Sequence, residues 1–133
     1  MHPELDKALY ERYPLIFAQR HAPMTATAMC WGFACEDGWY SLVDALCEEL
    51  QRATSNGDGP QVVARQVKQK YGGLRFYVDG ASENQTALIN FAEVLSLRMC
   101  EVCGAPGTLD ERPNIWMTTR CSEHRNTRSN KAL

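Results

Sequence analysis

Two metal-binding half-sites in the C-terminal third constrain the fold of this chain more than any other feature. Cys100 and Cys103 form a CxxC motif followed by Gly104, and after 17 intervening residues Cys121 and His124 form a CxxH motif. A two-residue spacer lets a tight turn aim both ligand atoms at one point, and glycine can take the positive φ that such a turn often needs. Together the half-sites predict a tetrahedral Cys3His site for one Zn²⁺ ion.

Four protein ligands leave no coordination position for water, so the motif indicates a structural rather than a catalytic metal. Iron or a redox-active cysteine pair are the alternatives that the motif leaves open. Three thiolates on a divalent ion leave a site charge of about −1, because each ligand cysteine binds as the thiolate. We expect the neighbouring Arg98, Arg120 and Arg125 to offset that charge.

The other three cysteines, Cys30, Cys35 and Cys47, raise the question of disulfides. The opening segment MHPELDKALYERYP is too charged for a signal peptide, so we expect a cytoplasmic protein with reduced thiols. A second metal site made with His21 is one alternative. The interpretation that we favour is that these thiols are buried as small hydrophobic groups, Cys30 and Cys35 in an aromatic-rich loop, residues 29–39, and Cys47 on the apolar face of the following helix.

The length of 133 residues allows one hydrophobic core with a small appended module. We therefore expect an α+β core over residues 1–97 and a zinc-finger module over 98–133, packed on that core. The hydrophobic fraction of 44% and the charged fraction of 23% are typical of globular proteins, and no apolar run reaches the roughly 18 residues of a membrane span. These observations exclude disordered, fibrous and membrane-spanning classes.

Hydrophobic spacing predicts three helices. The first covers about residues 3–13 and ends at Pro14, the second follows Asp37 and ends near residue 53, and the third begins at a capping box formed by Ser82 and Gln85. The third helix should turn an apolar stripe toward the core and run into the first metal half-site. The stripe comprises Leu88, Phe91, Ala92, Leu95 and Met99.

Apolar and polar residues alternate between residues 62 and 78, and this alternation predicts a β-hairpin. We place its turn at Gly72-Gly73. This register sets Lys70 opposite Arg75 and Lys68 opposite Tyr77 on one face. These four residues are our candidate partner-binding residues. The alternative is that they only solvate an exposed sheet face.

A second, smaller hairpin is expected between the metal half-sites, at 108–119 around Pro113-Asn114, and a short terminal helix should open at 121–124. The metal module then looks like a treble-clef or zinc-ribbon finger. The fold class is therefore α+β: a small antiparallel hairpin or sheet packed with about three helices, plus a C-terminal zinc finger.

The formal net charge is −2, but its distribution is uneven. Residues 1–60 carry four Lys/Arg and nine Asp/Glu, whereas residues 61–133 carry ten and seven, so an anionic partner would meet the second half. The last residues, RNTRSNKAL, have the composition of an electrostatic arm or an untethered tail. The chain has no GxSxG, Walker or HExxH motif, and we expect no enzymatic activity.

The segments KQKYGGLRFYVDG and CEVCGAPG…CSEH, separated by the third helix, resemble a group of small uncharacterised phage and prophage proteins, over roughly residues 30–125. The resemblance implies a viral accessory protein in the bacterial host cytoplasm. Such a protein would engage, and inhibit, a bacterial host or defence protein through apolar anchors such as Trp39, Trp116 or Tyr77. The alternatives are a nucleic-acid-binding zinc finger and a sponge for a small nucleotide.

Overall fold

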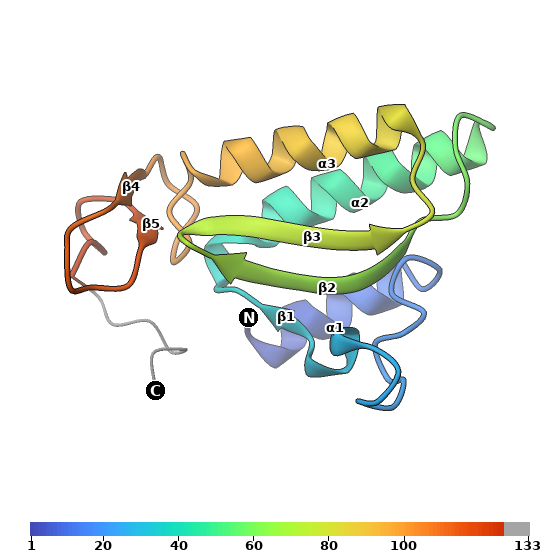
Figure 1. The fold of residues 1–133 in the computed structure, drawn as a ribbon, viewed down its shortest axis with the longest axis horizontal. Coiled ribbons are helices and arrows are strands. Elements are labelled where there is room, and N and C mark those ends of the chain that lie inside the picture. Colours follow the sequence, from blue (N-terminus) through green and yellow to red (C-terminus); the bar gives the residue numbers. More distant parts are fainter. Residues whose placement is uncertain (127–133) are drawn as a thin grey trace.

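The computed structural model describes residues 1–126, and residues 127–133, which include most of the expected C-terminal arm, lie outside it. Over residues 1–126 the fold is α+β, as predicted from the sequence, with three α-helices and two small sheets (Figure 1). In chain order the elements are α1 (Pro3–Arg12), the 3-10 turn η1 (Ala28–Trp31), β1 (Phe33–Ala34), the 3-10 turn η2 (Asp37–Trp39), α2 (Tyr40–Ser55), β2 (Val63–Lys70), β3 (Gly73–Asp79), α3 (Glu83–Ser96), β4 (Thr108–Asp110) and β5 (Thr118–Arg120).

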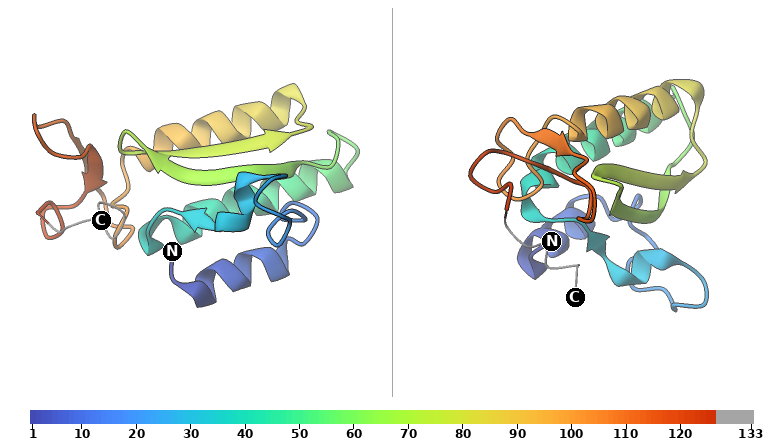
Figure 2. Two further views of the ribbon diagram at one scale, coloured as in Figure 1. Left: turned by 60° about the horizontal axis from the view of Figure 1, so that its bottom comes forward. Right: turned by 60° about the vertical axis from the view of Figure 1, so that its left-hand side comes forward.

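The main sheet has the strand order β1-β2-β3, with β1 parallel and β3 antiparallel to β2. Helix α3 runs along β3 and packs on α2, α1 lies at the opposite, β1 edge of the sheet, and the β4–β5 sheet stands at one end (Figures 1 and 2). The Phe17 ring bridges this arrangement by contacting the rings of Phe33 and Phe76. One hydrophobic core therefore joins the N-terminal helix to the hairpin.

The predicted helices exist, with two corrections. Asp37 precedes the second helix, as expected, but a 3-10 turn over Asp37–Trp39 comes first, so α2 begins only at Tyr40. On α3 the capping box of Ser82 and Gln85 is confirmed, but Phe91 does not belong to the core face: its side chain is 67% exposed, and Ile89 is buried instead. Among residues 1–126, no helix combines the length and the apolar character that crossing a bilayer requires.

The turn of the main hairpin is one residue earlier than the sequence predicts. Tyr71 and Gly72 both have positive φ, 53° and 83°, which is the conformation that a two-residue type I′ hairpin turn requires. Tyr71 is exposed, so its ring can point to solvent while its backbone takes the left-handed region. Gly73 instead belongs to β3, where a Cβ would lie 3.1 Å from the Leu97 side chain. The second glycine thus contributes to close packing on α3 rather than to the turn.

The shifted turn changes the cross-strand partners but not the two faces of the hairpin. Arg75 lies opposite Lys68, where the sequence predicted Lys70. Tyr77 lies opposite Gln66, where the sequence predicted Lys68. Because the pairing slips by two positions overall, each side chain keeps its face. The structure therefore retains the predicted cationic surface, which we call the open face: Gln66, Lys68, Lys70, Arg75 and Tyr77. Asp79 lies on the same side of β3, two positions beyond Tyr77, and pairs with Arg65 (2.7 Å).

The outer edge of β3 is held by side chains of α3. Ser96 Oγ accepts a hydrogen bond of 2.9 Å from the Leu74 N–H, and Glu93 Oε2 accepts one of 2.9 Å from the Phe76 N–H. Both N–H groups point away from β2, so they would otherwise need water or another chain as acceptor. Side chains of α3 thus accept the hydrogen bonds that a further strand would accept at this edge of the sheet.

The substitution Ser96→Ala should test this edge contact. Ser96 is fully buried, so the change leaves the Leu74 N–H without an acceptor, and we expect the free energy of unfolding to fall by about 1–3 kcal/mol. Urea denaturation measures the change. Ser41→Ala on the exposed surface of α2 is the matched control and should cost little. Equal stability of the two variants would contradict an edge-capping role for Ser96.

Candidate metal centre

The four predicted ligands come together at one end of the molecule. The ligand atoms of Cys100, Cys103, Cys121 and His124 all lie within 4.8 Å of one another. The Sγ atoms of Cys103 and Cys121 are 3.8 Å apart, and His124 Nδ1 lies 3.7 Å from Cys100 Sγ and 3.2 Å from Cys121 Sγ. The structure thereby places a candidate metal site at the residues that the sequence indicated.

The dimensions of the cluster fit a tetrahedral metal ion. With metal–sulfur bonds of about 2.3 Å and a metal–nitrogen bond of about 2.0 Å, a tetrahedral Zn²⁺ holds its ligand atoms roughly 3.5–3.8 Å apart. The Cys103–Cys121 and Cys100–His124 distances are close to this value, the Cys121–His124 distance is shorter, and the widest separation in the cluster, 4.8 Å at most, would contract by about 1 Å around an ion. His124 presents Nδ1 to the sulfurs, so Nδ1 is the nitrogen that would bind the ion.

The first half-site is a backbone knuckle. The Gly104 N–H donates to the Cys100 carbonyl (2.8 Å), and the Cys100 N–H donates to the Ala105 carbonyl (2.7 Å). Gly104 has a φ of +81°, and a Cβ there would lie 3.0 Å from the Gly38 carbonyl oxygen, so glycine is required both for the turn and for the space. The positive φ predicted at this position is confirmed.

The knuckle also prepares the Cys100 thiol to bind a cation. Burial acts to raise the pKa of this thiol, but the backbone N–H groups of Cys121, Cys103 and Val102 point at its sulfur and bring the pKa down to about 6. A thiolate is the form that ligates a metal. The same N–H groups would continue to stabilise sulfur charge once an ion is bound.

The knuckle packs against the turn before α2. The Gly38 N–H donates to the Glu101 carbonyl (2.7 Å), and Trp39 Nε1 donates to the Met99 carbonyl (2.9 Å). Glu101 is buried, and its Oε2 accepts from the Glu36 N–H at 3.1 Å. A Cβ at Gly38 would lie 2.3 Å from the Cys100 carbonyl oxygen, so only glycine permits this approach.

Two arginines beside the ligands neutralise carboxylates of the protein. Arg120, with a side chain only 2% exposed, pairs with Glu36 at 3.4 Å, and Arg125 pairs with Asp110 at 3.3 Å. We expected Arg98, Arg120 and Arg125 to offset the charge of the thiolates. Arg120 and Arg125 instead form ion pairs with carboxylates. The Arg120–Glu36 pair instead joins β5 of the metal module to the turn before α2.

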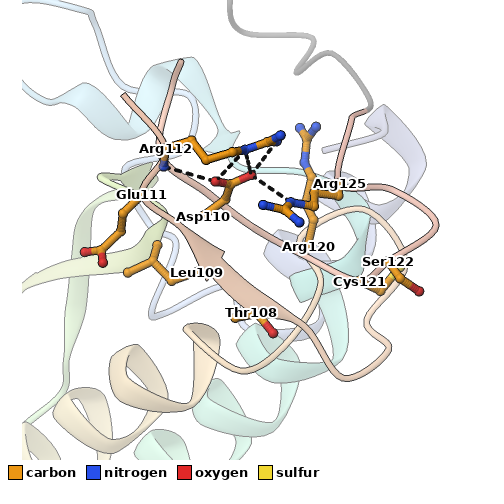
Figure 3. Close-up of a pocket in the computed structure, with 9 residues that line it drawn as sticks. All are labelled: Thr108, Leu109, Asp110, Glu111, Arg112, Arg120, Cys121, Ser122 and Arg125. Atoms are coloured by element: carbon orange, nitrogen blue, oxygen red, sulfur yellow. Dashed lines mark hydrogen bonds and ion pairs between the residues drawn. The ribbon is translucent and has the colours of Figure 1, made fainter. Parts of the chain in front are cut away.

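Asp110 organises the other side of the module. Its carboxylate accepts from the Arg112 guanidinium (2.6 Å at the shortest) and from Arg125 Nε, beside a cavity of about 530 Å³ (Figure 3). Hydrogen bonds from Arg112, with a smaller contribution from Arg125, lower the pKa of Asp110 to about 2. Since Arg125 follows His124 directly, this contact holds the second half-site close to β4.

Several other predictions are corrected here. The prediction that a short terminal helix opens at 121–124 is wrong. Residues 122–126 form turns, and the His124 N–H donates to the Cys121 carbonyl. Trp39 is fully buried and cannot serve as an exposed anchor. In residues 1–126 no second group of Cys and His residues is close enough for a metal, so the alternative site at Cys30, Cys35 and Cys47 does not form.

The structure brings together an exposed apolar cluster that the sequence did not reveal. Tyr71, Ile115 and Trp116, which we call the tip cluster, are 67%, 47% and 75% exposed and line a cavity of about 590 Å³. They come from the β2–β3 turn and the β4–β5 loop. Two hydrogen bonds fasten these segments together, from Gln69 Nε2 to the Met117 carbonyl (2.8 Å) and from Thr119 Oγ1 to the Gly72 carbonyl (2.7 Å).

Comparisons with known proteins add no relatives to this description. The chain matches no protein-family model, and neither the curated proteins nor the solved structures give a significant match.

We predict one zinc ion per chain and its loss in Cys103→Ser. Cys103 is exposed, so a serine there should have little effect on packing, whereas loss of one ligand removes most of the metal-binding energy, about 10 kcal/mol or more for a structural zinc. Elemental analysis of protein purified without chelators measures the metal. A melting curve should show a lower midpoint for the variant.

Cys30→Ser is the matched control, because Cys30 is only half-buried and lies outside the cluster. It should keep the metal and nearly the full melting temperature. Absence of zinc from the unmodified protein, or equal metal content and stability in both variants, would argue against a structural zinc at this site.

Proposed function

We propose that this protein is a phage-encoded, zinc-stabilised binding protein without enzymatic activity, which engages and inhibits a bacterial host or defence protein in the bacterial cytoplasm. The phage origin and the bacterial target rest on the resemblance of the YGGLRFYV hairpin and the two cysteine half-sites to small phage proteins. The binding role rests on the chain's own geometry. A Cys3His ligand set fills a tetrahedral ion, so the zinc has no position for a substrate.

The tip cluster is the observation that carries the binding role. Tryptophan and tyrosine contribute most of the binding energy in many protein interfaces, because they bury a large rigid surface at little entropic cost. Trp116 and Tyr71 stand exposed beside Ile115, at the junction of two hairpins. A host protein would bury these side chains.

The surroundings of the cluster favour tight binding because they fix its shape. The Gln69–Met117 and Thr119–Gly72 hydrogen bonds join the loop and the turn, and the metal ligands hold the strands that carry the loop. A contact surface that is already ordered loses less conformational entropy on binding. The zinc ion in this proposal therefore acts on affinity through rigidity and does not touch the partner.

Replacement of Trp116 by alanine tests the proposal. We expect capture of one bacterial protein from nuclease-treated lysate by the unmodified protein, with at least about 30-fold weaker binding for Trp116→Ala, the loss typical of a central tryptophan. Capture through apolar side chains should persist as salt is raised. An assay of the captured protein, with and without the phage protein, measures inhibition.

Trp31→Ala is the matched control, since Trp31 is also an exposed tryptophan, at 68%, but lies in η1 rather than in the tip cluster. Both variants should contain zinc and melt like the unmodified protein. If Trp31→Ala loses the captured protein and Trp116→Ala keeps it, or if the captured protein retains full activity, the proposed function is wrong.

A further inference from the structure

Most of the basic side chains of this protein are already paired. Among residues 1–126, eight of the twelve Lys and Arg side chains form ion pairs with carboxylates. Three of the four that have no such pair in the described residues, Lys68, Lys70 and Arg75, lie on the open face, and the fourth is Arg98 at the end of α3. The chain as a whole is slightly acidic, so acidic groups are abundant elsewhere. The open face thus concentrates cationic charge that no carboxylate within residues 1–126 neutralises.

The three cations form a regular array. Lys68 and Lys70 are two residues apart on β2, hence about 6.6 Å apart along one face of the strand, and Arg75 lies directly across from Lys68 on β3. The Arg75 guanidinium is held by a 3.1 Å hydrogen bond to the Leu74 carbonyl, while Lys70 Nζ lies 5.6 Å above the Tyr71 ring. Such an array suits a ligand with repeated negative charges rather than a single anion.

Exposed aromatic rings accompany the cations. Tyr77, 40% exposed, follows Arg75 by two positions on the open face, and Tyr71 stands at the turn beside Lys70. Beyond the turn, Trp116 lines the same cavity as Lys70 and Tyr71. Rings next to cations on a sheet surface are the combination by which several nucleic-acid-binding domains stack bases and hold phosphates.

We propose that the open face binds single-stranded nucleic acid, with phosphates held by Lys68, Lys70 and Arg75 and bases stacked on Tyr77 and Tyr71. This goes beyond capture of a host protein and does not depend on it. Paired bases in a duplex could not stack on these rings, so a duplex is the poorer ligand. An acidic protein segment would satisfy the cations, but it would leave unused the planar surfaces that lie among them.

Titration with a fluorescently labelled thymidine oligonucleotide of about twelve residues tests the proposal. Three phosphate contacts predict that log affinity falls with log salt with a slope of about −2, so binding should weaken roughly 16-fold between 50 and 200 mM salt. Lys68→Gln/Lys70→Gln should reduce the affinity at 50 mM salt at least tenfold and flatten the slope. The control Lys7→Gln/Arg52→Gln removes the same charge from ion pairs on α1 and α2 and should change the affinity less than threefold.

Stacking has its own test at Tyr77. Tyr77→Ala should weaken binding at least about fivefold, whereas Tyr77→Phe keeps the ring and should restore it. Zinc content and melting temperature of each variant show that the fold is intact. The outcome is independent of whether a host protein is captured, because Trp116→Ala tests that capture with no nucleic acid present.

Four results would overturn the proposal. The first is no binding of the oligonucleotide at 50 mM salt, and the second is an equal loss of affinity in the double variant and its control. The third is binding of a duplex or of oligoglutamate as tight as that of the single strand, which would mean general attraction of polyanions. The fourth is full competition by an equimolar thymidine mononucleotide, which would make the face a site for a free nucleotide.

Discussion

The close approach of Gly38 to the metal-binding knuckle is the contact on which the rest of this structure depends. Its amide donates to the Glu101 carbonyl, and its missing side chain lets the Cys100 carbonyl come within a distance that no Cβ allows. The neighbouring Trp39 is fully buried and donates to the Met99 carbonyl, so one short turn serves both the hydrophobic core and the metal module. The two parts are therefore joined through backbone contacts as well as through side chains.

This joining explains how a C-terminal module with very little hydrophobic core can hold its side chains in fixed positions. Beyond residue 100, Asp110, Thr118, Thr119 and Arg120 are buried although they are polar, and Arg120 pairs with Glu36 of the core. Buried polar groups stabilise a structure only when their partners are correctly placed. A bound metal ion would hold the segments that carry these polar residues at the ligand cluster, and the turn before α2 holds them against the hydrophobic core.

The sequence predicts the parts of the fold that obey local rules. The spacing of the cysteines and histidine predicts the four clustered ligands, and the capping box predicts the start of α3. The alternation of apolar and polar residues predicts the two faces of the hairpin. Prediction from the sequence fails where tertiary contacts override local preference. Tyr71 adopts a positive φ in the turn while Gly73 packs in β3 beside Leu97, and Phe91 stays exposed although its spacing is that of a core residue. The two-residue strand β1 and the tip cluster depend on residues distant in sequence, and no periodicity signals them.

The capping of β3 by Ser96 and Glu93 has a consequence for how copies of this protein can meet. An unsatisfied edge strand invites another chain to extend the sheet, which is a common route to fibrils and swapped dimers. Here the N–H groups of Leu74 and Phe76 are already used within the chain, and at the other edge β1 offers only two residues for pairing. Growth of the main sheet from molecule to molecule is thus disfavoured at both edges, so the hairpin can expose a charged face with a lower risk of sheet-to-sheet self-assembly.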